Sequence, residues 1–69
     1  MQVIELRDDF IKLGQALKAA GLTESGAEAK EAVIDGLVKV NGEICVQRGK
    51  KLYDGDTVQF GEDEIKIKK

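Results

Sequence analysis

A glycine at position 36 divides a helical pattern from a strand-like pattern, and this division limits the folds open to the chain. Before Gly36, the stretch SGAEAKEAVID carries small apolar residues at helical spacing. After it, LVKV and EICV alternate and flank Asn41-Gly42, a pair typical of type I′ hairpin turns, in which both central residues have positive φ. We therefore expect a helix that leads directly into an antiparallel hairpin.

The expected helix has signals at both of its ends. Ser25 and Glu28 have the SxxE spacing of a capping box, in which each side chain accepts a backbone N–H that the first turn leaves unpaired. Gly36 supplies a left-handed stop. The residues expected on the buried face are Ala29, Ala32 and Val33.

The hairpin after Gly36 also predicts which residues face each other. With a two-residue loop, Val40 lies opposite Glu43 and Val38 lies opposite Cys45. Cys45 is the only cysteine, so it cannot form an internal disulfide. We interpret it as a packed strand residue and not as a nucleophile.

The remaining segments complete a small α+β fold. DDFIKLGQALKAAG predicts an amphipathic helix of about three turns, behind Asp8 and Asp9 and ending at Gly21. YDGD is a predicted turn, TVQF and EIKIK are predicted strands, and the opening QVIEL is an additional edge strand. The predicted fold is two helices packed on a small, mainly antiparallel sheet of about four to five strands. The apolar face of the first helix is expected to consist of Phe10, Leu13, Leu17 and Ala20.

The length of the chain allows one domain, here residues 1–69. With two Phe, one Tyr and no Trp, its core must consist mainly of Ile, Leu, Val and Ala, so a deep catalytic cavity is not expected. No apolar run is long enough for a membrane span, and no secretory signal is visible. We therefore expect a cytoplasmic protein without membrane contact, and we expect it to be a monomer.

Positive charge is concentrated in one part of an otherwise acidic chain. The net charge is −2, which taken alone argues against nucleic-acid binding. Residues 39–51 nevertheless carry Lys39, Arg48, Lys50 and Lys51 against a single acid. Such a cluster either keeps a small sheet soluble or marks a local anion-binding surface.

The sequence offers little for catalysis or for metal binding. It has no His, no CxxC pair and no phosphate-loop motif. We interpret Asp54 and Asp56 as amide-capping residues of a turn, because a calcium loop needs a longer series of ligands. Glu62, Asp63 and Glu64 are interpreted as a solvated hairpin tip. We expect no enzymatic activity, no cofactor and no metal.

Several strings along the chain carry a family resemblance: LGQAL, GLTESGAEAK, IDGLVKVNGE and RGKKLYDGDTVQF. Their order resembles the S-four domain, the RNA-binding domain named for the fourth protein of the small ribosomal subunit, over residues 12–60. SGAEAK and RGKKLYDGD resemble the short, free-standing bacterial members of the YaaA and YbcJ type. The resemblance implies the alpha-L RNA-binding motif and a surface that reads structured RNA by shape and backbone.

One departure from the family pattern concerns the start of the second helix. Many family members have Arg directly after the helix-starting Ser, whereas this chain has Gly26. Ser25 can act there as a cap alone, and the residues by themselves favour this interpretation. The resemblance favours an additional anion-binding site, made of exposed N–H groups with Lys30 one turn further on.

The resemblance implies a non-catalytic module for structured RNA, in particular ribosomal RNA, with a role in ribosome assembly. Its implied partners are the ribosome or an assembly intermediate. The alternative is a protein-interaction module that retains the fold and docks on a protein partner. A sulfur carrier is a weaker alternative, because the chain has no C-terminal Gly-Gly. The implied RNA-binding residues are Lys12, Ser25, Gly26, Lys30, Arg48, Lys50 and Lys51.

Among these residues, Lys12 is the one most readily explained as a solvated surface charge that does not contact RNA. On the expected helix it follows Asp8 and Asp9 closely enough for their carboxylates to neutralise it.

Overall fold

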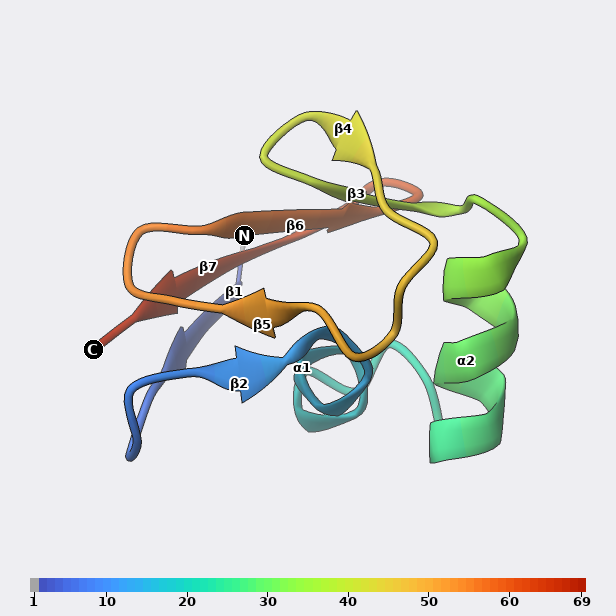
Figure 1. Ribbon diagram of the computed structural model, residues 1–69. Coiled ribbons are helices and arrows are strands. Elements are labelled where there is room, and N and C mark those ends of the chain that lie inside the picture. The colour runs from blue at the N-terminus through green and yellow to red at the C-terminus, as the bar shows by residue number, and fades with distance from the viewer. Residues whose placement is uncertain (1) are drawn as a thin grey trace.

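Two helices and seven strands form over residues 2–69, the part of the chain that the computed structural model describes (Figure 1). The predicted α+β class is confirmed. The helices are α1 (Leu13–Ala19) and α2 (Gly26–Ile34). The strands are β1 (Gln2–Glu5), β2 (Ile11–Lys12), β3 (Val38–Val40), β4 (Glu43–Ile44), β5 (Lys51–Leu52), β6 (Thr57–Phe60) and β7 (Asp63–Lys68).

Five of the strands form one sheet in the order β1-β7-β6-β3-β4. β1 runs parallel to β7 and the other neighbours are antiparallel, so the sheet is mainly antiparallel, as predicted. The opening segment is the predicted edge strand. Val40 pairs with Glu43, and the Cys45 N–H donates to the Val38 carbonyl at 3.0 Å, which confirms the predicted hairpin register.

The turn residues adopt the backbone conformations that the sequence predicts. Asn41 and Gly42 have φ angles of 51° and 86°, so both central positions of the β3–β4 turn are left-handed. Gly36 ends the second helix with a φ of 76°. In the turn between β5 and β6, Asp56 Oδ2 accepts the Tyr53 N–H at 2.8 Å, which confirms its capping role.

The core lies between the five-stranded sheet and the helices, which cover one face of it (Figure 1). Every fully buried residue of the core is aliphatic, as the composition predicts, and each large side chain of this kind contributes about 1.5–3 kcal/mol by burial. The other face of the sheet, called here the open face, carries the exposed residues Lys39, Lys66 and Lys68. The buried hydrophobic residues are Leu13, Ala16, Leu17, Ala29, Ala32, Val33, Val38, Val40, Leu52, Val58, Ile65 and Ile67.

α2 begins at the predicted cap, with one difference in hydrogen bonding. Ser25 Oγ accepts the Glu28 N–H at 3.2 Å. The Glu28 carboxylate, however, accepts the N–H of Glu24 at 3.3 Å and not that of Ser25. The expected helix start is therefore confirmed, whereas the expected reciprocal bond of the capping box is wrong by one residue.

α1 is shorter than the sequence pattern suggests, and its predicted start behind Asp8 and Asp9 is wrong. The helix begins only at Leu13, because Ile11 and Lys12 pair with β5 in a second, two-stranded sheet. Phe10 therefore lies outside the helix, and the prediction that it joins the helical apolar face is also wrong. This small sheet, called here the β2–β5 ribbon, was not expected from the sequence.

Cys45 lies one residue beyond β4, is partly buried and packs against the core, in agreement with a packing role. Within residues 2–69, neither helix is long and apolar enough to cross a membrane.

Candidate nucleic-acid interface

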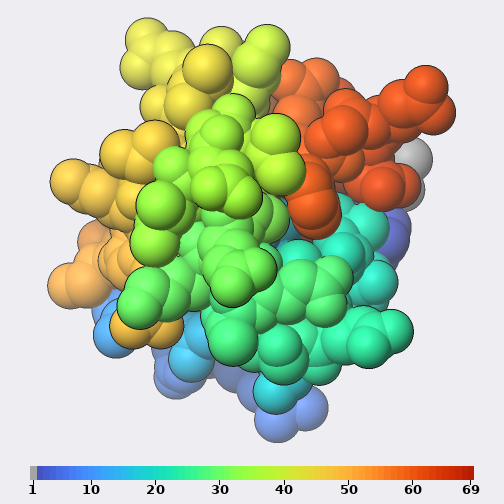
Figure 2. All heavy atoms as spheres, turned by 90° about the vertical axis from the view of Figure 1, so that its right-hand side faces the viewer, coloured from blue at the N-terminus to red at the C-terminus, as the bar shows by residue number. Residues whose placement is uncertain are grey.

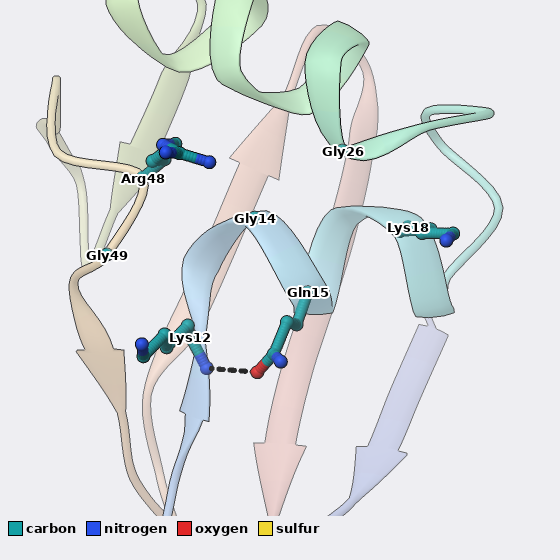
Figure 3. Close-up of a pocket in the computed structure, with 7 residues that line it drawn as sticks. All are labelled: Lys12, Gly14, Gln15, Lys18, Gly26, Arg48 and Gly49. Carbon is teal, nitrogen blue, oxygen red and sulfur yellow. Dashed lines mark hydrogen bonds between the residues drawn. The ribbon is translucent and has the colours of Figure 1, made fainter.

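A shallow depression with a volume of about 460 Å³ lies between the starts of the two helices and the loop that connects β4 to β5 (Figure 3). Three of its lining residues are cations and three are glycines, and no carboxylate is among them. This combination offers positive charge together with backbone that a ligand can approach closely. The lining residues are Lys12, Gly14, Gln15, Lys18, Gly26, Arg48 and Gly49.

Hydrogen bonds between backbones hold the loop against α1. The Leu13 N–H donates to the Lys50 carbonyl at 2.9 Å, and the Gly14 N–H donates to the Arg48 carbonyl at 3.0 Å. The Lys12 N–H donates to Gln15 Oε1 at 3.3 Å. Because these bonds occupy the N–H groups of Lys12, Leu13 and Gly14, these three donors are not free to bind an anion.

Arg48 extends from the loop toward the start of α2. In Figure 3 its guanidinium points into the gap between α1 and Gly26, while Lys12 and Lys18 lie toward opposite ends of α1. A guanidinium is always charged and presents several N–H donors in a plane, which suits bidentate contact with a phosphate. The depression therefore combines one directed cation with two flanking ammonium groups.

The start of α2 is open to solvent but is not strongly electropositive. A Cβ atom built on Gly26 would meet no other heavy atom within 4 Å, so a ligand can approach the backbone there. The carboxylates of Glu24 and Glu28 lie in the same turn, and Glu28 contacts the Glu24 N–H. These negative charges offset the helix dipole, so affinity for an anion must come mainly from the cations of the depression.

The depression brings together some of the residues implied by the family resemblance. Lys12, Gly26 and Arg48 line it, and Ser25 directly precedes Gly26 as the helix cap. Lys30 is exposed further along α2 and does not line the depression.

Lys50 and Lys51 lie in different surroundings from Arg48. Lys50 lines a second depression, which also includes Ile44 and Cys45. Lys51 belongs to β5 and not to the loop, and its Nζ lies 4.8 Å from the centre of the Phe10 ring. The three cations of the predicted basic loop therefore do not form a single cluster.

Four lining residues were absent from the sequence-based set: Gly14, Gln15, Lys18 and Gly49. Lys18 follows Gly14 by four residues, which places both on one side of α1. The sequence does contain this spacing, but only the position of the loop identifies that side as a lining of the depression.

The expected neutralisation of Lys12 by the preceding acids depends on a helix that does not form there. Asp8 and Asp9 lie outside α1, so helical spacing does not bring their side chains to Lys12. Asp9 instead forms an ion pair with Lys69, which lowers the pKa of the Asp9 carboxyl and raises the pKa of the Lys69 ammonium. Lys12 therefore lines the depression and is not drawn to these acids by helical spacing.

The side chains of the depression are suited to binding an anion. Its side chains are two ammonium groups, a guanidinium and an amide, all of which can donate hydrogen bonds. In the described residues 2–69, no group of three or more His, Cys, Asp or Glu residues is arranged to hold a metal ion.

Comparisons with known proteins give one matching family and several similar proteins. The family described as the S4 domain matches residues 4–68, a longer stretch than the residues that carry the S-four resemblance. YbcJ of Escherichia coli, provisionally named an RNA-binding protein, is 37% identical over 57 residues, covering 83% of this chain and 81% of the relative. RlbA of Bacillus subtilis, provisionally named a ribosome maturation protein, is 43% identical over 57 residues, covering 83% and 80%.

Proposed function

The chain belongs to the S4 domain family, and from this membership we propose that it is a non-catalytic module that binds structured RNA. The observation that carries the proposal is the depression with Lys12, Lys18 and Arg48, which has no carboxylate among its lining residues although the chain has a net charge of −2. Local positive charge in an acidic chain is the feature that phosphate contact requires.

The dimensions of the site favour contact with the RNA backbone. The depression is shallow and has no aromatic lining residue, so it suits phosphate groups better than an inserted base. Three glycines allow the RNA backbone to approach the protein backbone closely. Recognition in this depression is therefore by charge and shape, as for other modules that bind folded RNA.

Arg48 takes the role of the arginine that many family members carry after the helix-starting Ser. Gly26 occupies that position here, and it lines the same depression as Arg48. The guanidinium extends from the β4–β5 loop toward the start of α2 (Figure 3). A phosphate at the helix start can thus receive a charge-assisted hydrogen bond from a different part of the chain.

We assign ribosomal RNA as the target and ribosome maturation as the process. The names of the relatives support this step, since one refers to RNA binding and another to ribosome maturation. In this role the protein acts as a monomer on the ribosome or on an assembly intermediate.

The test compares two triple variants with equal changes of charge. The site variant carries Lys12→Gln, Lys18→Gln and Arg48→Gln. The control variant carries Lys39→Gln, Lys66→Gln and Lys68→Gln on the open face of the sheet. Lys69 is left unchanged because its ion pair with Asp9 would be lost.

Affinity is measured with refolded ribosomal RNA at low salt, and stability is measured by denaturant unfolding. The site variant is expected to bind at least about tenfold more weakly, while the control variant changes much less. Both sets of side chains are exposed, so both variants should keep their stability. Equal losses would assign binding to net charge, and unchanged affinity in the site variant would refute the depression as the RNA site.

A second candidate function, docking on a protein, is favoured by an exposed apolar patch. Ile34, Leu37, Ile44 and Val46 are each 55–61% exposed. A Cβ atom built on Gly36 would lie 3.7 Å from the Ile44 side chain, so the end of α2 lies beside β4. Figure 2 shows this face, with α2 in green and the segment around β4 in yellow.

Copurification distinguishes the two functions. A complex held by RNA should be lost after nuclease treatment and at high salt, because both remove phosphate contacts. A complex held by the apolar patch should survive both treatments and should be lost in an Ile44→Asp variant.

A further inference from the structure

The β2–β5 ribbon has one buried face and one face directed to solvent. Ile11 pairs with Leu52 and Lys12 pairs with Lys51. Leu52 is fully buried and Ile11 packs against the core, so this pair faces inward. Because side chains alternate along a strand, Lys12 and Lys51 face outward.

Two aromatic residues extend this outward face. Phe10 precedes β2 and Tyr53 follows β5, each two residues from an outward lysine. Their ring centres are 6.0 Å apart with an angle of 50° between the ring planes, and Lys51 Nζ lies 4.8 Å from the Phe10 ring centre. We call these four residues, Phe10, Lys12, Lys51 and Tyr53, the aromatic-lysine face.

Contact between the two rings does not explain why much of Tyr53 remains exposed. Cross-strand aromatic pairs stabilise small sheets, and Phe10 is partly buried in agreement with this role. Tyr53, however, keeps 49% of its surface exposed. An aromatic ring with a free surface, on the same face of the ribbon as two lysines, is the combination with which proteins stack an unpaired base and hold its phosphates.

The aromatic-lysine face is continuous with the depression described above, because Lys12 belongs to both. The Leu13 N–H bonds to the Lys50 carbonyl, so the next pair along the ribbon, Lys12 and Lys51, is a non-hydrogen-bonded pair. Side chains in such a pair lie close together. An RNA strand with a phosphate in the depression can therefore pass Lys12 and Lys51 and reach Tyr53.

We propose that Tyr53 is a stacking platform for an unpaired base of the bound RNA, with Lys12 and Lys51 contacting the phosphates beside that base. This inference rests on the proposed RNA-binding function. It defines the ligand class further, as an RNA helix with an adjacent unpaired nucleotide in a bulge, loop or single-stranded end. Stacking on a ring tolerates any base, so the face selects for an unpaired nucleotide and not for a sequence.

The experiment uses the full chain and two RNA probes, a hairpin with a short single-stranded adenosine overhang and the same hairpin with a blunt end. The parent protein is expected to bind the overhang probe about tenfold more tightly. Tyr53→Phe keeps the ring and should keep this preference. Tyr53→Leu keeps an apolar side chain without the ring, and the preference should fall to near unity.

Fluorescence gives an independent readout, because Tyr53 is the only tyrosine and the chain has no tryptophan. A Tyr53→Trp variant is excited at wavelengths where RNA absorbs little. Its emission should be quenched by the overhang probe and should change much less with the blunt probe. This measurement tests base stacking at position 53 even if Tyr53→Leu does not fold.

The outcomes separate the inference from the function on which it rests. If Tyr53→Leu keeps the preference, or if Tyr53→Trp is quenched equally by both probes, the stacking platform is refuted. The proposed function then still stands if the site variant of the depression loses affinity. If the parent protein binds neither probe nor ribosomal RNA, both proposals fail together.

Discussion

Gly26 is the position where this chain and the common family pattern differ most informatively. A side chain there would project into open space, since a Cβ atom would have no neighbour within 4 Å. Arg48 approaches the same space from the β4–β5 loop (Figure 3). The absence of a side chain at position 26 therefore leaves room for a guanidinium supplied from elsewhere, or for the RNA backbone itself.

Gly26→Arg tests whether RNA approaches the start of α2. The new guanidinium should raise RNA affinity by about tenfold through one additional charge-assisted contact. Its effect on stability should be small, within about 0.5 kcal/mol, because the carboxylates of Glu24 and Glu28 offset the helix dipole that a cation would otherwise oppose at this end. Affinity and unfolding are compared with a Gln59→Arg control on the open face of the sheet. An unchanged affinity would show that RNA does not reach Gly26.

The site residues differ in how far the sequence could predict them. Lys12, Gly26 and Arg48 were predicted from the family resemblance, and the fold brings them together. Lys18 could not be assigned, because its place in the depression depends on where a loop some 30 residues later lies against α1. Lys50 was grouped with Arg48 by sequence proximity, although it lines a different depression.

Asn41 links two turns that are distant in sequence. Its Nδ2 donates to Asp56 Oδ1 at 3.0 Å, and its Oδ1 accepts the Thr57 N–H at 2.9 Å. Asp56 in turn accepts the Tyr53 N–H. The amide of Asn41 thus connects the β3–β4 hairpin to the turn that positions Tyr53, in addition to providing a positive φ.

Asn41→Gly separates these two roles, because Gly adopts the same backbone conformation without the side chain. We expect a loss of about 1–2 kcal/mol in the free energy of unfolding, because the side-chain hydrogen bonds of Asn41 with Asp56 and with the N–H and hydroxyl of Thr57 are removed. Asp56→Ala should be destabilising as well, and the double variant should lose less than the sum of the two. Denaturant unfolding measures this cycle. Strict additivity would mean that the Asn41–Asp56 contact contributes nothing to stability.

Elements with local signals were predictable, and elements that depend on distant partners were not. α2 has a cap at Ser25 and a stop at Gly36, and both ends were predicted correctly. The β2–β5 ribbon has strands of only two residues, which carry no detectable period. Its formation delays the start of α1 to Leu13, because pairing with Lys51 holds the backbone of Lys12 extended.

The distribution of charge over the whole molecule sets the conditions under which it can bind RNA. The chain has a net charge of −2 and dimensions of 28 × 22 × 19 Å. The Debye length is about 10 Å at 0.1 M salt and about 30 Å at 0.01 M. At the higher salt an RNA bound in the proposed site would therefore be screened from most of the acidic surface, whereas at the lower salt it would be repelled by the net charge of the entire protein.

Neutralising acids far from the depression tests whether the net negative charge weakens RNA binding at low salt. Glu62 in the β6–β7 turn and Asp63 at the start of β7 are exposed and lie outside the depression. Changing Glu62→Gln together with Asp63→Asn brings the net charge from −2 to zero. At about 0.01 M salt this variant should bind RNA several-fold more tightly than the parent, and at about 0.1 M the two should bind equally.

The logarithm of the parent's affinity should fall with the logarithm of the salt concentration with a slope of about −2.5 above 0.1 M, as expected for three phosphate contacts. Below about 0.1 M this slope should be shallower. Titrations across this range measure both effects. An equal gain at both salt concentrations would place the β6–β7 turn in contact with RNA, and no gain at low salt would show that net charge does not limit binding.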